Sequence, residues 1–264
     1  MLKKRLIPKL LIKNHLIGGR QRNVLVTTSN FSRHTIVGDV VSQAKIHEAQ
    51  MADELIVLNI NGTVLSQDKS LLDLIENLAV QTFMPLCVGG GVRHLSDFEN
   101  LLSKGADKVS LNTAALVNPE FISAAANRYG SQCVIVSIDF KMMNDGLTCR
   151  VMQNGGQLET RYDVLSWARE AYNNGAGEIL LCDIDRDGNG QGLNILIAQQ
   201  IADELPIPVI ISGGCGRAEH FAEGFVDGRV DAVAAGTFFA LRDQNLLQTR
   251  SHIANAGVSI RLNN

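Results

Sequence analysis

The chain of 264 residues is 45% apolar and contains 24 glycines, which is enough to bury a large core, and α/β barrels of this length are commonly single domains. Its formal net charge of −3 and pI near 6.1 leave no basic footprint, so we expect no nucleic-acid partner. The amino terminus has a short basic run but no long apolar segment, and no stretch reaches membrane-spanning length, which favours a cytoplasmic location.

The five cysteines are scattered and form no metal-binding pattern. None of them belongs to a CxxC pair, and no Cys/His spacing resembles a zinc site. Three lie at or in apolar segments, where cysteine behaves as a small hydrophobic residue. We therefore predict no disulfide, no metal and no cofactor.

Short apolar segments alternate with amphipathic segments eight times. The apolar ones are nearly continuous, as in parallel strands that are buried on both faces. We predict strands at Arg5–Ile12, Glu54–Ile60, Pro85–Val88, Lys108–Leu111, Cys133–Asp139, Glu178–Asp183, Pro208–Ser212 and Ala232–Ala235. We predict helices at Asp39–Gln50, Ser70–Thr82, Ser96–Ser103, Asn118–Arg128, Asp163–Asn174, Asn194–Glu204, Arg217–Phe225 and Gln244–Ala256.

Residue types at the ends of these helices support the assignment. Ser96 and Asn118 are predicted N-caps, the second with Pro119 at the first helical position. Three glycines stand where helix C-terminal caps are expected, namely Gly105, Gly130 and Gly175.

Eight strand–helix units indicate an α/β fold, a single (β/α)8 TIM barrel over residues 1–264, rather than a doubly wound sheet, which would need a reversal of strand order. Two longer segments interrupt the rhythm, Lys13–Val37 and Lys141–Arg161. We predict both as loops over the catalytic face, the first as a lid, and Leu147–Gln153 alternates like one arm of a hairpin.

The barrel is predicted to consist of two related halves, about 1–130 and 131–264. Glu54 and Glu178, Gly90 and Gly214, and Asn112 and Gly236 are each 124 positions apart. Each half has an apolar strand, then a glycine-rich strand end, then a strand that ends in small or amide residues. Because barrels build phosphate sites from such strand ends, we expect two facing phosphate sites and a substrate with a phosphate at each end.

Several segments in order resemble the HisF family, the cyclase subunit of imidazole glycerol phosphate synthase. They cover essentially the whole chain and are Leu86–Val92, Gly105–Ala115, Gly130–Asp139, Gly175–Leu181, Asp185–Gly188 and Ser212–Gly214. The resemblance implies a lyase of histidine biosynthesis and a two-protein complex. In that complex a separate HisH-type glutaminase releases ammonia at the amino-terminal face of the barrel, and the ammonia reacts with a bisphosphorylated substrate at the other end.

The resemblance also assigns candidate site residues. The implied entrance of the ammonia channel is Arg5, Glu54, Lys108 and Glu178, although a purely stabilising salt-bridge cluster is the alternative. The implied phosphate-binding residues are Gly89, Gly90, Gly91 and Asn112 in one half, and Asp187, Gly188, Ser212, Gly213, Gly214, Ala235 and Gly236 in the other. Asp139 matches one of the family's two catalytic aspartates.

The chain departs from the family pattern where the other catalytic aspartate is expected. Leu11 stands at that position, and leucine can neither donate nor accept a proton. Thr27 stands where the family has a phosphate-binding lysine, with Lys13 or Arg20 as alternatives across an insertion. Asn59 and the pair Cys182-Asp183 also differ from the family residues.

The sequence leaves three hypotheses about the function open. In the first, ammonia delivery persists but the cyclase chemistry has diverged toward acetamidino sugars of bacterial surface polysaccharides. In the second, the protein is the ordinary histidine-pathway cyclase, and Asp183 or Asp185 replaces the missing carboxylate. In the third, the barrel makes no product, and binds a phosphorylated ligand to activate the glutaminase. A sugar-phosphate isomerase is a weaker reading, because that family also uses the aspartate missing at Leu11.

Overall fold

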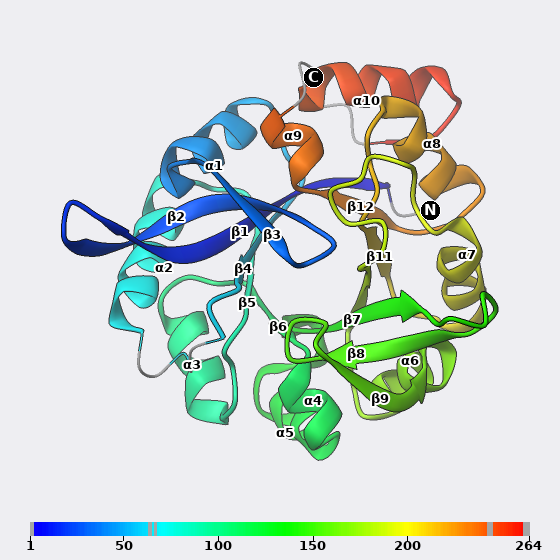
Figure 1. Ribbon diagram of the computed structural model, residues 1–264, viewed down its shortest axis with the longest axis horizontal. Helices are drawn as coiled ribbons and strands as arrows, with labels where there is room; N and C mark the ends of the chain where they lie inside the picture. The colour runs from blue at the N-terminus through cyan, green and yellow to red at the C-terminus, as the bar shows by residue number, and fades with distance from the viewer. Residues whose placement is uncertain (1–2, 63–64, 66–67, 242–244, 261–264) are drawn as a thin grey trace.

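Eight parallel strands close into a barrel that is surrounded by helices (Figure 1). The computed structural model describes residues 3–62, 65, 68–241 and 245–260. In order around the barrel the strands are β1 (Arg5–Ile17), β4 (Leu55–Asn59), β5 (Leu86–Gly89), β6 (Lys108–Leu111), β7 (Val134–Met142), β10 (Glu178–Asp183), β11 (Val209–Ser212) and β12 (Ala232–Ala235). β12 pairs back onto β1, so the predicted (β/α)8 barrel is confirmed.

The helices cover the outside of the barrel in the predicted positions. They are α1 (Val40–Ala49), α2 (Lys69–Gln81), α3 (Leu95–Ser103), α5 (Glu120–Tyr129), α6 (Val164–Asn173), α7 (Ile195–Glu204), α8 (Ala218–Val226) and α10 (Leu246–Asn255). Gln244, the predicted start of the last helix, lies outside the described residues. No helix in the described part of the chain is long and apolar enough to cross a membrane.

Two short helices were not predicted, and they occupy equivalent places in the two halves. α4 (Thr113–Val117) follows β6, and α9 (Thr237–Leu241) follows β12. Their first residues are 124 positions apart, the same separation as in the sequence duplication. The backbone therefore repeats in the two halves at the strand ends where the phosphate sites are predicted.

Two predicted N-caps are wrong by one or two residues. α3 begins after His94 rather than Ser96, because the Asp97 carboxylate accepts the backbone N–H groups of His94 (3.0 Å) and Arg93 (2.9 Å). α5 has Pro119 at its N-cap position, and the Asn118 side chain accepts the N–H of Glu120 (3.2 Å) from one residue further out. The C-terminal glycines are confirmed, since Gly105, Gly130 and Gly175 all have positive φ just after a helix.

The core has an outer layer and a smaller inner layer. On β1, Leu6, Leu10 and Ile12 belong to the outer core between the strands and the helices. Ile7 points the other way, as the period of two requires, and belongs to an inner cluster with residues of the other strands. That cluster consists of Ile7, Ile56, Cys87, Ile135, Leu180, Cys182, Ile210, Ala232 and Ala234. An apolar layer therefore separates the two ends of the barrel.

The predicted loop Lys13–Val37 is instead a pair of antiparallel hairpins. β1 continues to Ile17 and turns into β2 (Arg20–Ser29), which pairs with β3 (Arg33–Gly38). The β1–β2 hairpin extends beyond the ring of helices, and the β2–β3 turn lies over the centre of the barrel (Figure 1). The charged residues of segment 13–37 are typical of a loop, but Val24 and Val26 are buried against the barrel mouth.

The second long segment also forms strands, as the alternation of Leu147–Gln153 indicated in part. β8 (Cys149–Gln153) pairs with β7 and with β9 (Leu158–Asp163), and it is antiparallel to both. β7 and β8 extend the barrel wall at its carboxyl-terminal end. Both hairpin systems thus stand at the end of the barrel where the site is predicted.

Candidate functional site

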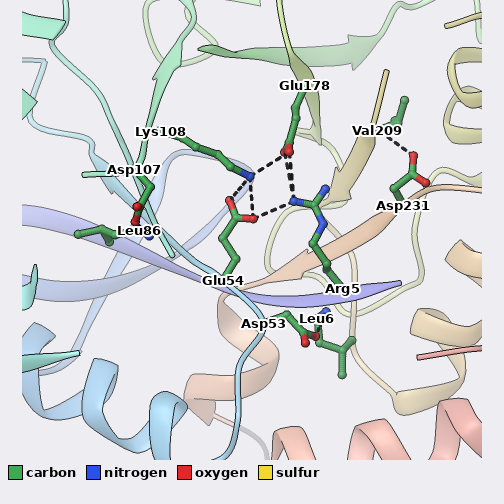
Figure 2. Close-up of polar contacts among 10 residues, drawn as sticks. All are labelled: Arg5, Leu6, Asp53, Glu54, Leu86, Asp107, Lys108, Glu178, Val209 and Asp231. Carbon is green, nitrogen blue, oxygen red and sulfur yellow. Dashed lines mark hydrogen bonds and ion pairs between the residues drawn. The ribbon is translucent and has the colours of Figure 1, made fainter. Parts of the chain in front are cut away.

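Four charged side chains close the amino-terminal end of the barrel as one ion-pair network, here called the charge ring (Figure 2). Arg5 Nη1 donates to Glu54 Oε2 (2.8 Å) and to Glu178 Oε1 (3.2 Å). Lys108 Nζ donates to Glu54 Oε2 (3.0 Å) and to Glu178 Oε1 (2.9 Å). The structure therefore brings together all four residues that the sequence placed at this end.

Burial and charge act against each other in the charge ring. Burial raises the pKa of Glu54, an effect that Lys108 and Arg5 oppose and that Glu178 reinforces. Burial disfavours the charged forms of Arg5 and Lys108, but the two glutamates outweigh it and raise both pKa values. Both cations stay charged, and each keeps two carboxylate partners.

Three aspartates beside the ring hold the strands in register (Figure 2). Asp53 accepts the N–H of Leu6 (2.8 Å), and Asp107 accepts that of Leu86 (2.8 Å). Asp231, which is 124 positions after Asp107, accepts the N–H of Val209 (3.1 Å). These bonds tie neighbouring strands together independently of the charge ring.

Asp139 lies at the opposite end, near the end of the barrel portion of β7, and is 9% exposed. Ser137 Oγ donates to Asp139 Oδ1 (3.4 Å). Burial raises the pKa of Asp139 to about 6, although the nearby Lys9 ammonium lowers it. A carboxyl group with such a pKa can accept and return a proton near neutral pH.

The second predicted phosphate site surrounds a cavity at the mouth. Its glycine-rich walls come from β11, β12 and the loop after β10, and Lys9 and Thr27 line it from β1 and β2. Ser212 Oγ is buried there without a hydrogen-bond partner among the described residues. The predicted residues that line this cavity are Asp187, Gly188, Ser212, Gly213, Gly214, Ala235 and Gly236.

The first predicted phosphate site is built differently and lies outside that cavity. Gly90 has φ +91° and sits so close to Asn59 that a Cβ would be 2.0 Å from the Asn59 carbonyl oxygen. Asn112 donates through Nδ2 to the Ser137 carbonyl (3.0 Å). Gly89 and Gly91 flank Gly90 at the same strand end. The glycine at position 90 is thus required by the close packing of the Asn59 backbone, and one Asn112 donor is already engaged.

Leu11 lies in an apolar cluster at the mouth. It is 8% exposed and packs with Val24 and Val26 of the hairpin, and partly buried Leu58 and Ile60 pack against the same cluster. Leu11 also lines the cavity, so a carboxylate at this position would have hydrocarbon on its hairpin side, which disfavours its charged form.

The carboxylates of Asp183 and Asp185 are held in the loop after β10. Asp183 accepts N–H groups of Asp185 (3.0 Å) and Arg186 (3.3 Å) through Oδ1, and the Asn194 amide (2.8 Å) through Oδ2. Burial raises the pKa of Asp183, which the Asn194 hydrogen bond opposes. Asp185 accepts the N–H of Met142 (2.8 Å). Both side chains stabilise local backbone.

The β2–β3 turn is fastened across the mouth. Thr28 Oγ1 donates to Asp187 Oδ2, and the N–H of Asn30 donates to the Asp187 carbonyl (3.0 Å). Phe31, with φ +55°, packs against the inner cluster of the barrel. Asp187 is therefore both a wall of the cavity and the anchor of this turn, a second role that the sequence did not indicate.

Lys9 is the residue at the mouth that the sequence analysis missed. It is 5% exposed on β1 and lies in the cavity. Lys13, an expected alternative, lies 3.3 Å from His34 outside the cavity, and Arg20 is exposed in the β1–β2 hairpin. The signal that could have identified it is a lysine in a strand that is otherwise apolar, because lysine is rarely buried without a function or a partner.

The fold and the site together define a duplicated (β/α)8-barrel protein with a charge ring at one end and its glycine-rich strand ends at the other. The family model described as "Histidine biosynthesis protein" matches residues 10–244. The chain belongs to this family, and to the HisF proteins within it.

Two relatives match over nearly their whole length. The chain is 48% identical over 262 residues to a Prochlorococcus marinus (strain MIT 9313) protein named "Putative imidazole glycerol phosphate synthase subunit hisF2", covering 99% of each chain. It is 40% identical over 261 residues to "Imidazole glycerol phosphate synthase subunit HisF" of Geobacillus kaustophilus (strain HTA426), covering 99% of this chain and all of the relative.

Proposed function

We propose that this barrel is the ammonia-using subunit of a glutamine amidotransferase complex. A HisH-type glutaminase docks at the amino-terminal end of the barrel and releases ammonia beside the charge ring. The ammonia crosses the inner cluster and reacts with a phosphorylated substrate at the mouth. Membership of the HisF proteins and the names of the two relatives support this assignment.

The observation that carries the proposal is the charge ring facing the mouth through an apolar layer. Burying four charges is costly, and apolar residues of similar size would often stabilise a fold as well. The aspartates of the strand ends already hold the register, so the ring is better explained by selective entry. Neutral ammonia can cross the inner cluster, whereas ammonium would lose its hydration there.

The mouth supports a substrate with phosphate groups. Gly213, Gly214 and Gly236 allow backbone groups to approach an oxyanion in the cavity, and the unpartnered Ser212 hydroxyl is a further donor. The second position is proposed at the strand end of Gly90 and Asn112, which stand 124 positions before Gly214 and Gly236 in the repeat. Asp139 lies near the end of the barrel wall between these halves and is the proposed proton acceptor.

We further propose that the reaction has diverged from imidazole ring closure. Leu11 lies in an apolar cluster, and Asp183 and Asp185 are held by the loop. The described carboxylate that does act on Asp139 is Asp187, which accepts a hydrogen bond from Thr28 and anchors the β2–β3 turn. Conversion of an acetamido group to an acetamidino group needs ammonia and an activated carbonyl but no ring closure, since ammonia adds to the carbonyl carbon and water leaves. A nucleotide-linked N-acetyl sugar of surface polysaccharide synthesis carries phosphates and such a group.

The ordinary histidine-pathway reaction is the second candidate, favoured by the full-length similarity to the Geobacillus kaustophilus protein. The test gives purified protein excess ammonium at alkaline pH with either phosphoribulosyl formimino carboxamide ribonucleotide or a nucleotide-linked N-acetyl sugar. We expect no imidazole glycerol phosphate from the first acceptor. Rapid formation of imidazole glycerol phosphate would replace the divergent function with the ordinary one.

A barrel that only activates the glutaminase is tested with the Asp139→Asn variant. We expect loss of product while ligand binding and stimulation of the glutaminase persist. If wild type and variant both stimulate the glutaminase and neither forms product from either acceptor, the barrel is an activator.

A further inference from the structure

Lys9 is a buried cation at the mouth, and neither the charge ring nor the proposed proton acceptor Asp139 accounts for it. It is 5% exposed, and among the described residues no carboxylate oxygen lies within ion-pair distance of Nζ. In contrast, Arg5 and Lys108 of the charge ring each contact two glutamates. A buried ammonium without a direct ion pair is costly, and this one lines the ligand cavity. Its position therefore points to a bound molecule.

The surroundings of Lys9 place it with Asp139. Lys9 Nζ lies 4.0 Å from Cys182 Sγ, and Cys182 is paired in register with Asp139 on the neighbouring strand. Ser137 Oγ lies 4.0 Å from the same sulfur and donates to Asp139. Lys9 on β1 and Asp139 on β7 thus approach one shared neighbour from different parts of the barrel wall.

The charges around Lys9 keep it protonated. Burial disfavours the ammonium form, but the Cys182 sulfur once ionised, together with the carboxylates of Asp187 and Asp139, outweighs this effect and raises the Lys9 pKa. Burial raises the pKa of the Cys182 thiol to about 12, so this sulfur is a neutral neighbour at physiological pH. The carboxylates of Asp187 and Asp139 are the charges that favour the Lys9 ammonium there.

We propose that Lys9 is a catalytic residue of the ammonia-using reaction, and that its ammonium binds the carbonyl oxygen of the group that ammonia attacks. This role rests on the proposed function. It gives the mouth a positively charged donor opposite Asp139, although Leu11 two residues further along β1 has no polar group.

The two side chains together balance the addition step. The ammonia nitrogen forms a bond to the carbonyl carbon as the carbon–oxygen π bond breaks, and that electron pair moves to oxygen. The Lys9 ammonium donates a hydrogen bond to this oxyanion. Asp139 accepts the proton that the new ammonium centre on the substrate must lose. It returns this proton to the substrate oxygen, which leaves as water as the carbon–nitrogen double bond forms. Preorganised donors of this kind typically contribute a factor of about 100 to 1,000 to kcat.

The rival role for Lys9 is phosphate binding, because Ser212 and the glycines of the same cavity are nearby. The direction of the side chain favours the catalytic role, since Nζ reaches Cys182 in the strand next to Asp139. The two roles predict different kinetics. A phosphate-binding lysine contributes to KM, whereas a donor to the oxyanion contributes to kcat.

The kinetic test compares Lys9→Met, Lys9→Arg and the wild type with ammonium and whichever acceptor the wild type converts. Lys9→Met keeps the length of the side chain without its charge. We expect its kcat to fall about 100-fold or more, with KM within about threefold, and Lys9→Arg to retain more activity. Lys45→Met on the exposed face of α1 is the matched control and should leave both constants unchanged.

A second measurement needs no turnover. Carboxyl carbon NMR titration of the Asp139 side chain, together with binding of inorganic phosphate, is compared between wild type and Lys9→Met. We expect the Asp139 pKa to rise above about 6 in the variant, because Lys9 lowers it, with Ser137, Cys182 and Asp187 as its other neighbours. Phosphate affinity should change less than about threefold.

The outcomes separate the two proposals. An unchanged Asp139 pKa with loss of phosphate binding, or a raised KM at constant kcat, would overturn the catalytic role and make Lys9 a phosphate ligand. A wild type that converts neither acceptor would reject the proposed function, and the role of Lys9 with it. An active wild type and an equally active Lys9→Met would reject the role of Lys9 alone.

Discussion

Lys9 and Leu11 are two residues apart on β1, and both line the cavity, but their side chains have different neighbours. Leu11 packs with Val24 and Val26 of the hairpin, whereas the Lys9 ammonium lies beside Cys182. The hairpin therefore packs hydrocarbon against Leu11, and the Lys9 ammonium reaches toward the strand next to Asp139. Polar chemistry on this strand is therefore concentrated at Lys9.

Replacement of Asp139 by Asn should stabilise the folded protein at neutral and alkaline pH. The Asp139 pKa is about 6 in the folded protein, against the ordinary value of 3.8 for an aspartate in an unfolded chain. As pH rises from 4 to 6, the unfolded chain loses this proton first, so the folded state becomes less stable and stays so above 6. Two pKa units correspond to about 3 kcal/mol, an upper limit for the gain in Asp139→Asn.

Denaturant unfolding at pH 4 and pH 8 checks this prediction. Asp139→Asn should exceed the wild type by about 1–3 kcal/mol at pH 8 and match it more closely at pH 4. Asp73→Asn, on the exposed face of α2, serves as the control for the substitution itself. An Asp139→Asn protein that is less stable than wild type at pH 8 would show that the ionised carboxylate stabilises the mouth.

Individual site residues could be predicted from the sequence where they match a family pattern. The resemblance identified Arg5, Glu54, Lys108 and Glu178, and the structure places them in contact. The sequence shows Lys9 as a single lysine in an apolar strand, but its role could not be assigned, because no pattern pairs it with a partner residue. Its importance depends on Cys182, which is 173 residues away along the chain.

Among the elements, the β2–β3 turn is the one whose position decides access to the mouth. Gly188 has φ +71°, and a Cβ there would lie 2.0 Å from the Thr28 carbonyl oxygen. We predict that Gly188→Ala displaces the turn and breaks its hydrogen bonds to Asp187. Amide exchange of residues 29–34 should accelerate about tenfold, equivalent to about 1.4 kcal/mol of local stability.

Gly146→Ala separates contact from backbone strain. Gly146 has φ +66°, but nothing lies within 4 Å of an added Cβ, so the substitution adds strain without touching the β2–β3 turn. Hydrogen exchange of residues 29–34 should remain at the wild-type rate in this variant. Equal acceleration in both variants would mean that the Gly188 contact does not hold the turn.

The barrel strands were predictable from the sequence, but the hairpins were predicted only in part. Buried parallel strands are apolar on both faces, so Glu178–Asp183 and Ala232–Ala235 are found with the predicted bounds. The first residues of β2 and nearly all of β3 are exposed, and their charged residues resemble those of a loop. Only the barrel mouth, which buries Val24 and Val26, makes strands of them.

Across the whole molecule, the charge ring connects four strands at the end opposite the mouth. Glu54→Gln leaves Arg5 and Lys108 with Glu178 as their remaining carboxylate partner in the ring. We predict a loss of about 1–3 kcal/mol in unfolding free energy, below the usual cost of breaking a fully buried pair, because both cations are partly exposed. The glutamine-dependent rate should fall more than the ammonium-dependent rate.

Denaturation and the two rates measured in parallel check this prediction. Glu76→Gln breaks an exposed pair with Lys104 and should cost less than about 1 kcal/mol without changing the ratio of the rates. If Glu54→Gln lowers both rates equally, the ring contributes to the fold or to the mouth rather than to the delivery of ammonia.

The amino-terminal end also offers a surface for the proposed glutaminase. Phe83 is 91% exposed in the loop between α2 and β5, and such loops lie at the end of the barrel that carries the charge ring. Exposed aromatic side chains often dominate binding energy. We predict that Phe83→Asp weakens binding of the glutaminase at least about tenfold, about 1.4 kcal/mol, without lowering the stability of the barrel.

Calorimetric titration with the cognate glutaminase measures the affinity. Leu147→Asp is the matched control, because Leu147 is 88% exposed in the turn after β7, at the opposite end. A loss of affinity in Leu147→Asp alone would place the glutaminase at the mouth and contradict entry of ammonia through the ring.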